Sequence, residues 1–192
     1  MALSMYQASV PVYIKLLNGL AGCLKKAAAH YAEHKYDEAS LLSYRLYPDM
    51  FPFAKQVQEA TNHARNTARL AGQEPPKVGE NERSLAELIA RVEQTVAFMQ
   101  TLKPEQIDGS EEKTITVTRR DVAVNYTGIQ FLLGRSMPNF NFHSTTAYNI
   151  LRHNGVAVGK RDYLGSKRAL RKPCFAEGGM HARMVVLSKA DG

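Results

Sequence analysis

Apolar residues recur at helical spacing in four long stretches of the chain, and this pattern predicts four long helices. The stretches cover residues 4–34, 49–71, 84–102 and about 129–153. In each stretch the apolar positions follow i, i+3, i+4 and i+7, so they gather on one face of a helix. Each of these faces must be covered by another element, because water would otherwise contact a wide apolar stripe.

Capping and stop signals support these boundaries. Asp49 is predicted to cap the second long helix, and Gly72 is predicted to end it. Ser84 and Glu87 have the spacing of a capping box for the third. Residues 38–46 predict an additional short helix between the first and second long ones.

The hydrophobic period changes in residues 114–126, TITVTRRDVAVNY, which alternate and are rich in Thr and Val. This pattern predicts a β-hairpin that turns near residues 119–121. Four long helices with one small hairpin predict an all-α protein, a four-helix bundle with the hairpin between the third and fourth long helices. We expect the fourth helix to bend at Pro138.

Charge is distributed unevenly along the chain. The formal net charge is +7, and residues 152–192 carry nine Lys and Arg against three Asp and Glu, which is +6 of that total. We interpret residues 1–165 as one helical domain and residues 166–192 as a basic, loosely ordered C-terminal tail, in which MVVL could form a short strand. A basic tail is commonly a solvated surface, so nucleic acid is an unlikely partner.

The two cysteines, Cys23 and Cys174, have no neighbouring partner in the sequence, which fits a reducing cytoplasm. The N-terminal apolar stretch lacks a basic leader, and no apolar run approaches the ~20 residues that a bilayer requires. We therefore expect a cytoplasmic protein without a membrane partner.

A polar stripe runs along the fourth helix, in the segment PNFNFHSTTAYNILRHNG. Asn139, His143, Thr146, Ile150 and His153 share one face at 3.6 residues per turn. The flanks are aromatic and aliphatic, so Asn139 and His143 should point at other helices. Buried polar groups without partners cost about 1–3 kcal/mol each, so the partners of these two residues are the central question.

Other candidate residues have ordinary structural interpretations. His30 and His34 stand at i, i+4 among charged residues and are predicted to lie on a solvated face, and His63 is likewise predicted to be exposed. Arg45 and Asp49 flank the Pro48 break and are predicted to pair and fix that turn; the alternative is contact with an anion at the mouth of the bundle.

Four separated segments resemble the uncharacterised branch of the DinB-like metalloenzyme superfamily. They are MYQASVPVYIKLLNGL, LLSYRLYPDMFPFAKQVQ, PNFNFHSTTAYNILRHNGV and VGKRDYLG, in this order, within residues 1–165. The resemblance implies an up-down-down-up four-helix bundle, often dimeric, with a central metal site. It implies three ligands, for which this chain has Gln56 on the second long helix and Asn139 and His143 on the fourth.

Only one of these three ligand positions is a histidine, and neutral amide oxygens are weak ligands for Zn²⁺ or Ni²⁺. Three interpretations stay open: a divalent metal site, a hydrogen-bonded group that fixes helix register, and a small-molecule pocket. A pocket at this centre would also include Arg45, Asp49, Thr146 and Tyr148.

Two functions follow from the resemblance. The first is a small-molecule-binding or stress-related accessory protein with a degenerate metal site. The alternative is a divalent-metal-dependent enzyme, a thiol transferase or isomerase, or a hydrolase, in which His143 is a ligand and the amides complete or orient the ligand set.

Overall fold

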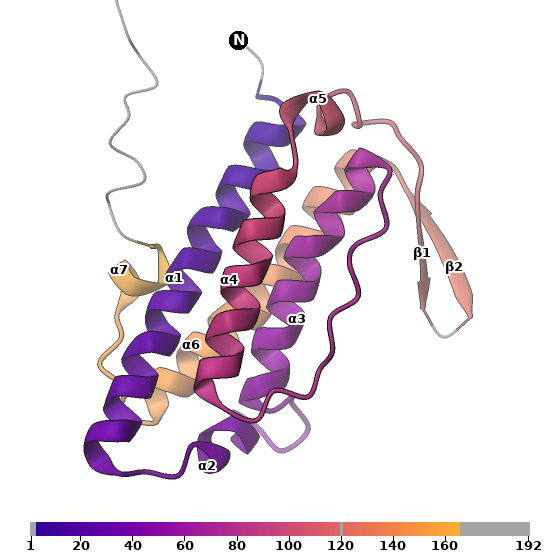
Figure 1. The fold of residues 1–192 in the computed structure, drawn as a ribbon. Helices are drawn as coiled ribbons and strands as arrows, with labels where there is room; N and C mark the ends of the chain where they lie inside the picture. The colour runs from indigo at the N-terminus through magenta and orange to yellow at the C-terminus, as the bar shows by residue number, and fades with distance from the viewer. Residues whose placement is uncertain (1–2, 120, 166–192) are drawn as a thin grey trace, which may run out of the picture.

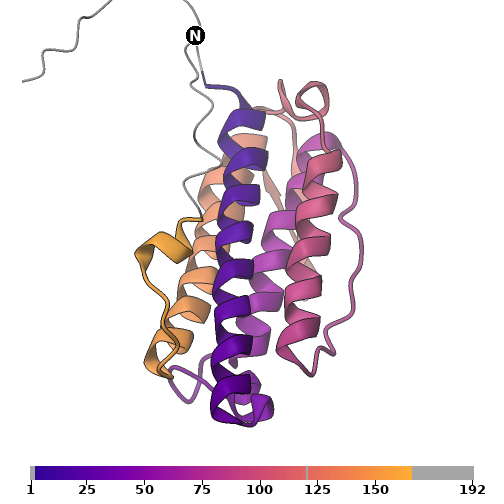
Figure 2. The ribbon, with the colours of Figure 1, turned by 60° about the vertical axis from the view of Figure 1, so that its left-hand side comes forward.

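The computed structural model describes residues 3–119 and 121–165, and these are mostly helical with one small antiparallel hairpin. The four longest helices lie side by side (Figure 1), and the rotated view shows the same arrangement (Figure 2). They are α1 (Met5–His34), α3 (Phe53–Arg65), α4 (Leu85–Thr101) and α6 (Met137–His153). All four predicted long helices are therefore present in the described part of the chain.

Shorter elements connect the long helices or follow the last of them. They are α2 (Glu38–Ser43), the 3-10 helix η1 (Asn66–Ala71), α5 (Pro104–Ile107), β1 (Ile115–Arg119), β2 (Val122–Tyr126), the π-helix η2 (Gln130–Ser136) and α7 (Lys160–Tyr163). Gly72 ends η1 with φ 74°, as its position in the sequence predicted.

The helix caps agree only in part with the sequence prediction. Ser84 caps α4, and its hydroxyl accepts from the Glu87 amide. The Glu87 carboxylate accepts from the Arg83 amide, so it does not close the predicted box on Ser84. The prediction that Asp49 caps this helix was wrong, because α3 begins after Pro52. A proline fits this position, since the first N–H groups of a helix have no partner within the helix and proline has no N–H.

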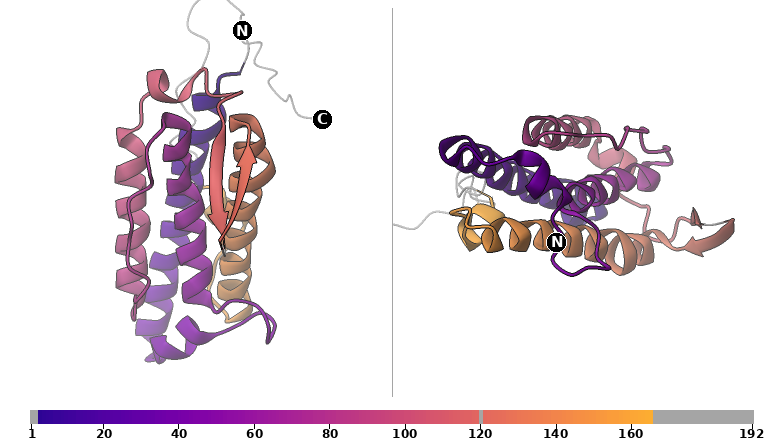
Figure 3. Two further views of the ribbon diagram at one scale, coloured as in Figure 1. Left: turned by 90° about the vertical axis from the view of Figure 1, so that its right-hand side faces the viewer. Right: turned by 90° about the horizontal axis from the view of Figure 1, so that it is seen from below.

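The hairpin pairs β1 with β2 in the register Ile115↔Tyr126 to Arg119↔Val122, so the predicted element and its turn are confirmed. Figure 3 shows the hairpin as a two-stranded ribbon along the outside of the helices. Val122 and Val124 are exposed, whereas Ile115 is buried. Only the Ile115 end of the hairpin therefore joins the core.

A change of helical period precedes Pro138. The Met137 amide donates to the Leu132 carbonyl, five residues back, which is the π pattern that marks η2. Pro138 has no N–H to donate to the preceding turn. A bend was expected at Pro138, and the structure has a π segment directly ahead of this proline.

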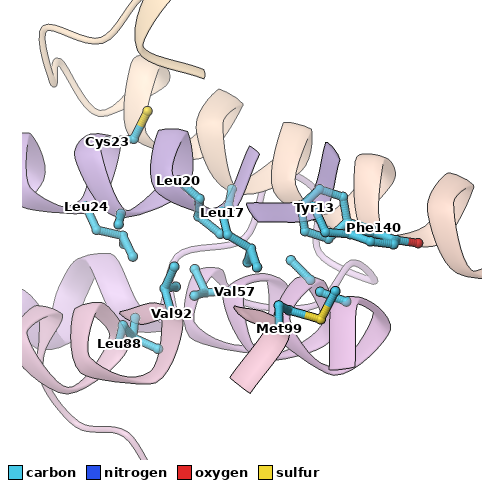
Figure 4. Packing of buried hydrophobic residues seen from close by; sticks show 14 of the residues in the cluster. Tyr13, Leu17, Leu20, Cys23, Leu24, Val57, Leu88, Val92, Met99 and Phe140 are labelled. Carbon is cyan, nitrogen blue, oxygen red and sulfur yellow. The ribbon is translucent and has the colours of Figure 1, made fainter. Parts of the chain in front are cut away.

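The core is formed where the long helices face one another, and Figure 4 shows its packing. Tyr13 and Phe140 meet edge to face with ring centroids 5.0 Å apart. Leu17 of α1, Val57 of α3 and Leu88 of α4 are also fully buried and contribute to the same cluster. One continuous core therefore holds the long helices in fixed positions.

The segment after α6 folds back against α1, as predicted from the sequence. Lys26 of α1 forms an ion pair with Asp162 of α7 at 2.8 Å. The predictions for residues 166–192, the basic tail and its short strand, lie outside the described residues. Within the described ranges, no helix is both long and apolar enough to cross a membrane.

Candidate functional site

The candidate site lies between α3 and α6, which pack along each other (Figure 1). His143 of α6 is 8% exposed, and its Nδ1 is 2.7 Å from Oε1 of Gln56 on α3. Gln56 itself is 1% exposed. The structure thus brings together two of the three residues that the resemblance implied, inside the protein.

The third residue, Asn139, has another partner. Its amide nitrogen donates to the carbonyl of Arg135, one turn earlier on the same helical stretch, at 2.7 Å. Asn139 is half-buried, and none of its side-chain hydrogen bonds in the described residues reaches His143 or Gln56.

The orientation of the Gln56 amide determines the tautomer of His143. Gln56 Nε2 donates to the Phe51 carbonyl at 3.0 Å. The opposite orientation of the amide is excluded, because it would place the Gln56 oxygen against the Phe51 carbonyl oxygen. Its Oε1 therefore faces His143 and can only accept. The Nδ1 of His143 must then carry the proton, which leaves Nε2 with a free lone pair.

Two residues of α3 complete a cluster with His143. A carboxylate oxygen of Glu59 and a ring nitrogen from each of His63 and His143 all lie within 4.8 Å of one another. The rings of His63 and His143 are nearly parallel, with centroids 5.8 Å apart. Glu59 and His63 stand at i, i+4 on α3, which places both on the side of that helix that faces α6.

Both imidazoles are held in the neutral form. Burial lowers the pKa of His63 from 6.5 to about 4, and the positive charges of protonated His143 and of Arg135 act in the same direction. Burial also lowers the pKa of His143. Neutral imidazole is the form that binds a metal ion or accepts a proton, so the site is prepared for either role at neutral pH.

Aromatic rings and one cation surround the cluster. Phe51 lies nearly parallel to the His143 ring at 6.2 Å, and Phe142 meets it edge-on at 5.2 Å. Lys55 pairs with the Glu59 carboxylate at 2.8 Å. The aromatic rings lower the local polarity, which strengthens electrostatic interactions such as the pair of Lys55 with Glu59.

A buried relay fixes the backbone at His63. The Ser136 hydroxyl donates to the His63 carbonyl at 2.8 Å and accepts from the Tyr13 hydroxyl at 3.0 Å. Burial raises the pKa of Tyr13 to about 12, so this phenol stays protonated. Three helical elements are thus joined where His63 enters the site.

The four predicted pocket residues have other contacts. Thr146 is buried and donates to the Phe142 carbonyl, and Tyr148 meets the Tyr163 ring edge-on. Arg45 donates to the Met50 carbonyl. Among the described residues Arg45 forms no ion pair with Asp49, so the predicted pairing at the Pro48 turn is absent there.

Sequence reasoning missed Glu59 and His63. The prediction that His63 is exposed was wrong: the residue is half-buried, because α6 covers one side of its ring. A signal was available, since Gln56, Glu59 and His63 follow i, i+3 and i+7 and so share one helix face. The polar residues next to His63 in the sequence led instead to the prediction that it is exposed.

Comparisons with known proteins find a family and a similar solved structure for this chain. A family model described as "Domain of unknown function (DUF1993)" matches residues 5–164. A crystal structure of a DinB family member protein from Shewanella denitrificans is similar, with 36% identity and a TM-score of 0.77. The match covers 85% of this chain and 93% of that chain. No curated protein matches the sequence.

Proposed function

Since the chain belongs to the DUF1993 family and is similar to a DinB family member, we propose that it binds a divalent transition-metal ion through Glu59, His63 and His143. The convergence of these three donors within 4.8 Å, with both imidazoles neutral, carries the proposal. The proposed ligand set therefore differs from the Gln56, Asn139 and His143 set that the resemblance implied, and keeps only His143.

The donor set suits such an ion. Two imidazoles and one carboxylate are ligands that Zn²⁺ and neighbouring divalent ions accept. Ligand atoms lie about 2.0–2.2 Å from Zn²⁺, so two of them on one tetrahedral ion are about 3.4 Å apart. The 4.8 Å limit is wider than this, so the side chains of the cluster would have to move closer together to bind one ion.

Gln56 has a supporting role in this proposal. Metal-binding histidines usually donate their second ring N–H to a fixed acceptor, which sets the tautomer and the ring orientation. The 2.7 Å contact between Gln56 Oε1 and His143 Nδ1 fits this role. Phe51 in turn orients Gln56 through its carbonyl.

Three protein ligands leave a coordination position for another molecule. A bound ion would supply Lewis acidity there, for example to water or to a thiol. This fits the enzyme alternative, a metal-dependent thiol transferase, isomerase or hydrolase. A small-molecule-binding accessory role is compatible with the same position.

Titration with metal tests the proposal. Untagged protein treated with EDTA should bind one Zn²⁺ or Ni²⁺ per chain in isothermal titration calorimetry and unfold at a higher temperature when the ion is present. His63→Ala, His143→Ala and Glu59→Gln should each weaken binding at least tenfold. His34→Ala, which changes an exposed histidine of α1, should not.

Two results would contradict the metal site. One is binding of fewer than about one ion per ten chains. The other is binding that survives His143→Ala. In either case, the cluster would act only as a hydrogen-bonded group that fixes the register of α3 against α6.

We also propose two finer features that the resemblance implied, an up-down-down-up bundle and a homodimer, and the cytoplasmic location that the cysteines suggested. The helix directions that can be followed in Figure 1 support the first. Exposed apolar side chains, among them Leu133 and Phe142, support the second. The free, buried thiol of Cys23 suits a reducing compartment. Light scattering at micromolar concentration would test the dimer.

A further inference from the structure

A second polar region lies on the other side of α3, facing α4 and the segment that connects η1 to α4. Figure 1 shows this segment running beside α3. A pocket of about 340 Å³ opens between them. Helix residues Asn62, Arg65 and Asn66 line one side, and Pro75, Pro76 and Lys77 of the segment line the other.

Two buried arginines in this region have different surroundings. Arg91 is 2% exposed, and its guanidinium is paired with Glu82 at 2.7 Å and also donates to Thr61 and Asn62. Arg65 is 4% exposed and donates only to Asn62 among the described residues. No carboxylate of residues 3–119 and 121–165 lies within ion-pair distance of Arg65.

Nearby carboxylates are already occupied. Glu80 lines the pocket, but its oxygens accept from Lys55 at 2.6 Å and from Asn62 at 2.8 Å. Glu82 is held by Arg91 and by Gln58. An ion removed from water costs several kcal/mol unless it is paired, so the Arg65 charge lacks the compensation that Arg91 has.

Arg65 remains positively charged despite this environment. Burial and, to a smaller extent, the charge of Arg91 lower its pKa, Glu80 and Glu82 act against this, and the result is a pKa of about 10. At neutral pH the guanidinium is therefore protonated, and all of its N–H groups are donors.

The unused donors of Arg65 are accessible. Among the described residues, the Nε and Nη1 groups of Arg65 have no acceptor. In the same part of the chain, the side-chain polar atoms that are both fully buried and without a partner are Thr67 Oγ1 and Ser110 Oγ, so the two Arg65 nitrogens are not fully buried. Since Arg65 lines the pocket, these donors can be reached from it. Lys77 adds a second positive charge at the pocket's opposite wall.

We propose that this pocket binds a small organic anion, whose carboxylate or phosphate group contacts Arg65 and Lys77. A guanidinium forms short, charge-assisted hydrogen bonds with either group. Pro75, Pro76 and Val78 give the pocket an apolar wall for the body of the ligand. The pocket is separate in space from the metal cluster, because its residues face α4 whereas His63 faces α6.

NMR titration of the arginine Nε–H signals tests this proposal. Metal-free protein would be titrated with sodium phosphate and, separately, with sodium benzoate at constant ionic strength. We expect a saturable shift of the Arg65 signal with at least one of the two anions. Saturation by only one would identify phosphate or carboxylate as the preferred group.

Variants assign the binding to the pocket. Arg65→Gln removes a charged donor, so affinity should fall at least tenfold. Lys77→Gln, at an exposed position that the fold does not need, should also weaken binding. Arg69→Gln is the matched control, because Arg69 pairs with Glu74 outside the pocket and its loss should leave affinity unchanged.

Two results would overturn the proposal. One is a shift that rises linearly with both anions and equals the shift that sodium chloride causes. The other is saturable binding that Lys77→Gln leaves intact and that persists in folded Arg65→Lys and Arg65→Gln proteins.

Discussion

Lowering the pH from 7.5 to 5 should destabilise the protein through His63. Its pKa is about 4 in the folded protein, against 6.5 for an ordinary histidine. Between these values the unfolded chain binds the proton and the folded protein does not. The free energy of unfolding therefore falls as the pH falls through this window, and it is fully retained above about pH 6.5.

The size of the effect follows from the same two pKa values. Complete protonation below pH 4 would remove about 3 kcal/mol, because each pKa unit corresponds to about 1.36 kcal/mol. Between pH 7.5 and pH 5 the loss from His63 is about 2 kcal/mol. His143 adds a loss of the same sign, since burial lowers its pKa too.

Urea unfolding in the presence of EDTA, followed by circular dichroism at several pH values, measures this loss. His63→Asn removes the titrating group, so its loss between pH 7.5 and 5 should be about 2 kcal/mol smaller than that of the wild type. His34→Asn, at an exposed position, is the matched control and should follow the wild type. The carboxylates with lowered pKa, Glu80 and Glu82, titrate below this interval.

Equal pH dependence of the wild type and His63→Asn between pH 7.5 and 5 would refute this reasoning. It would mean that the folded protein accommodates a charged imidazole at this position. The inference that the His63 imidazole is neutral and ready to bind a metal ion would then fail too.

Three further predictions concern packing and polar networks. Gly19→Ala places a Cβ 2.3 Å from the Tyr163 carbonyl and should destabilise the protein by about 1–3 kcal/mol in thermal unfolding, whereas Gly22→Ala, with nothing within 4 Å, should stabilise it by about 0.5–1 kcal/mol. Arg91→Leu leaves Glu82 without its buried partner and should cost about 3–5 kcal/mol in urea unfolding, with a smaller cost in the Glu82→Gln background. Gln56→Leu leaves the Phe51 carbonyl and His143 Nδ1 unpaired, so it should cost about 1–3 kcal/mol and weaken Zn²⁺ binding in calorimetry.

Local sequence signals were sufficient for much of the fold. The α1 helix begins after its Ser4 cap, and the hairpin turns where the period of 2 predicted, because both depend on neighbouring residues. The start of α3 was misplaced, because Asp49 and Pro52 both resemble helix starts and tertiary packing decides between them. The π segment was also beyond local reasoning, since its extra residue depends on how η2 packs.

The candidate site shows where such reasoning ends. His143 was identified because aromatic neighbours on its own helix implied burial. The burial of His63 depends on α6, which is distant in sequence. Its polar neighbours Asn62 and Asn66 indicated solvent, and the helical spacing of Gln56, Glu59 and His63 was overlooked. Those asparagines in fact face the pocket beside Arg65.

The α3 helix therefore contributes residues to two polar regions, which lie on different faces of the helix because of its 3.6-residue period. Glu59 and His63 project toward α6, whereas Asn62 and Arg65 project toward the connecting segment and α4. Lys55 contacts carboxylates of both regions, Glu59 at 2.8 Å and Glu80 at 2.6 Å. The two sites therefore share one cation. If a metal ion bound Glu59 and broke its ion pair with Lys55, Lys55 would pair with Glu80 alone. Binding at one site can influence the other in this way.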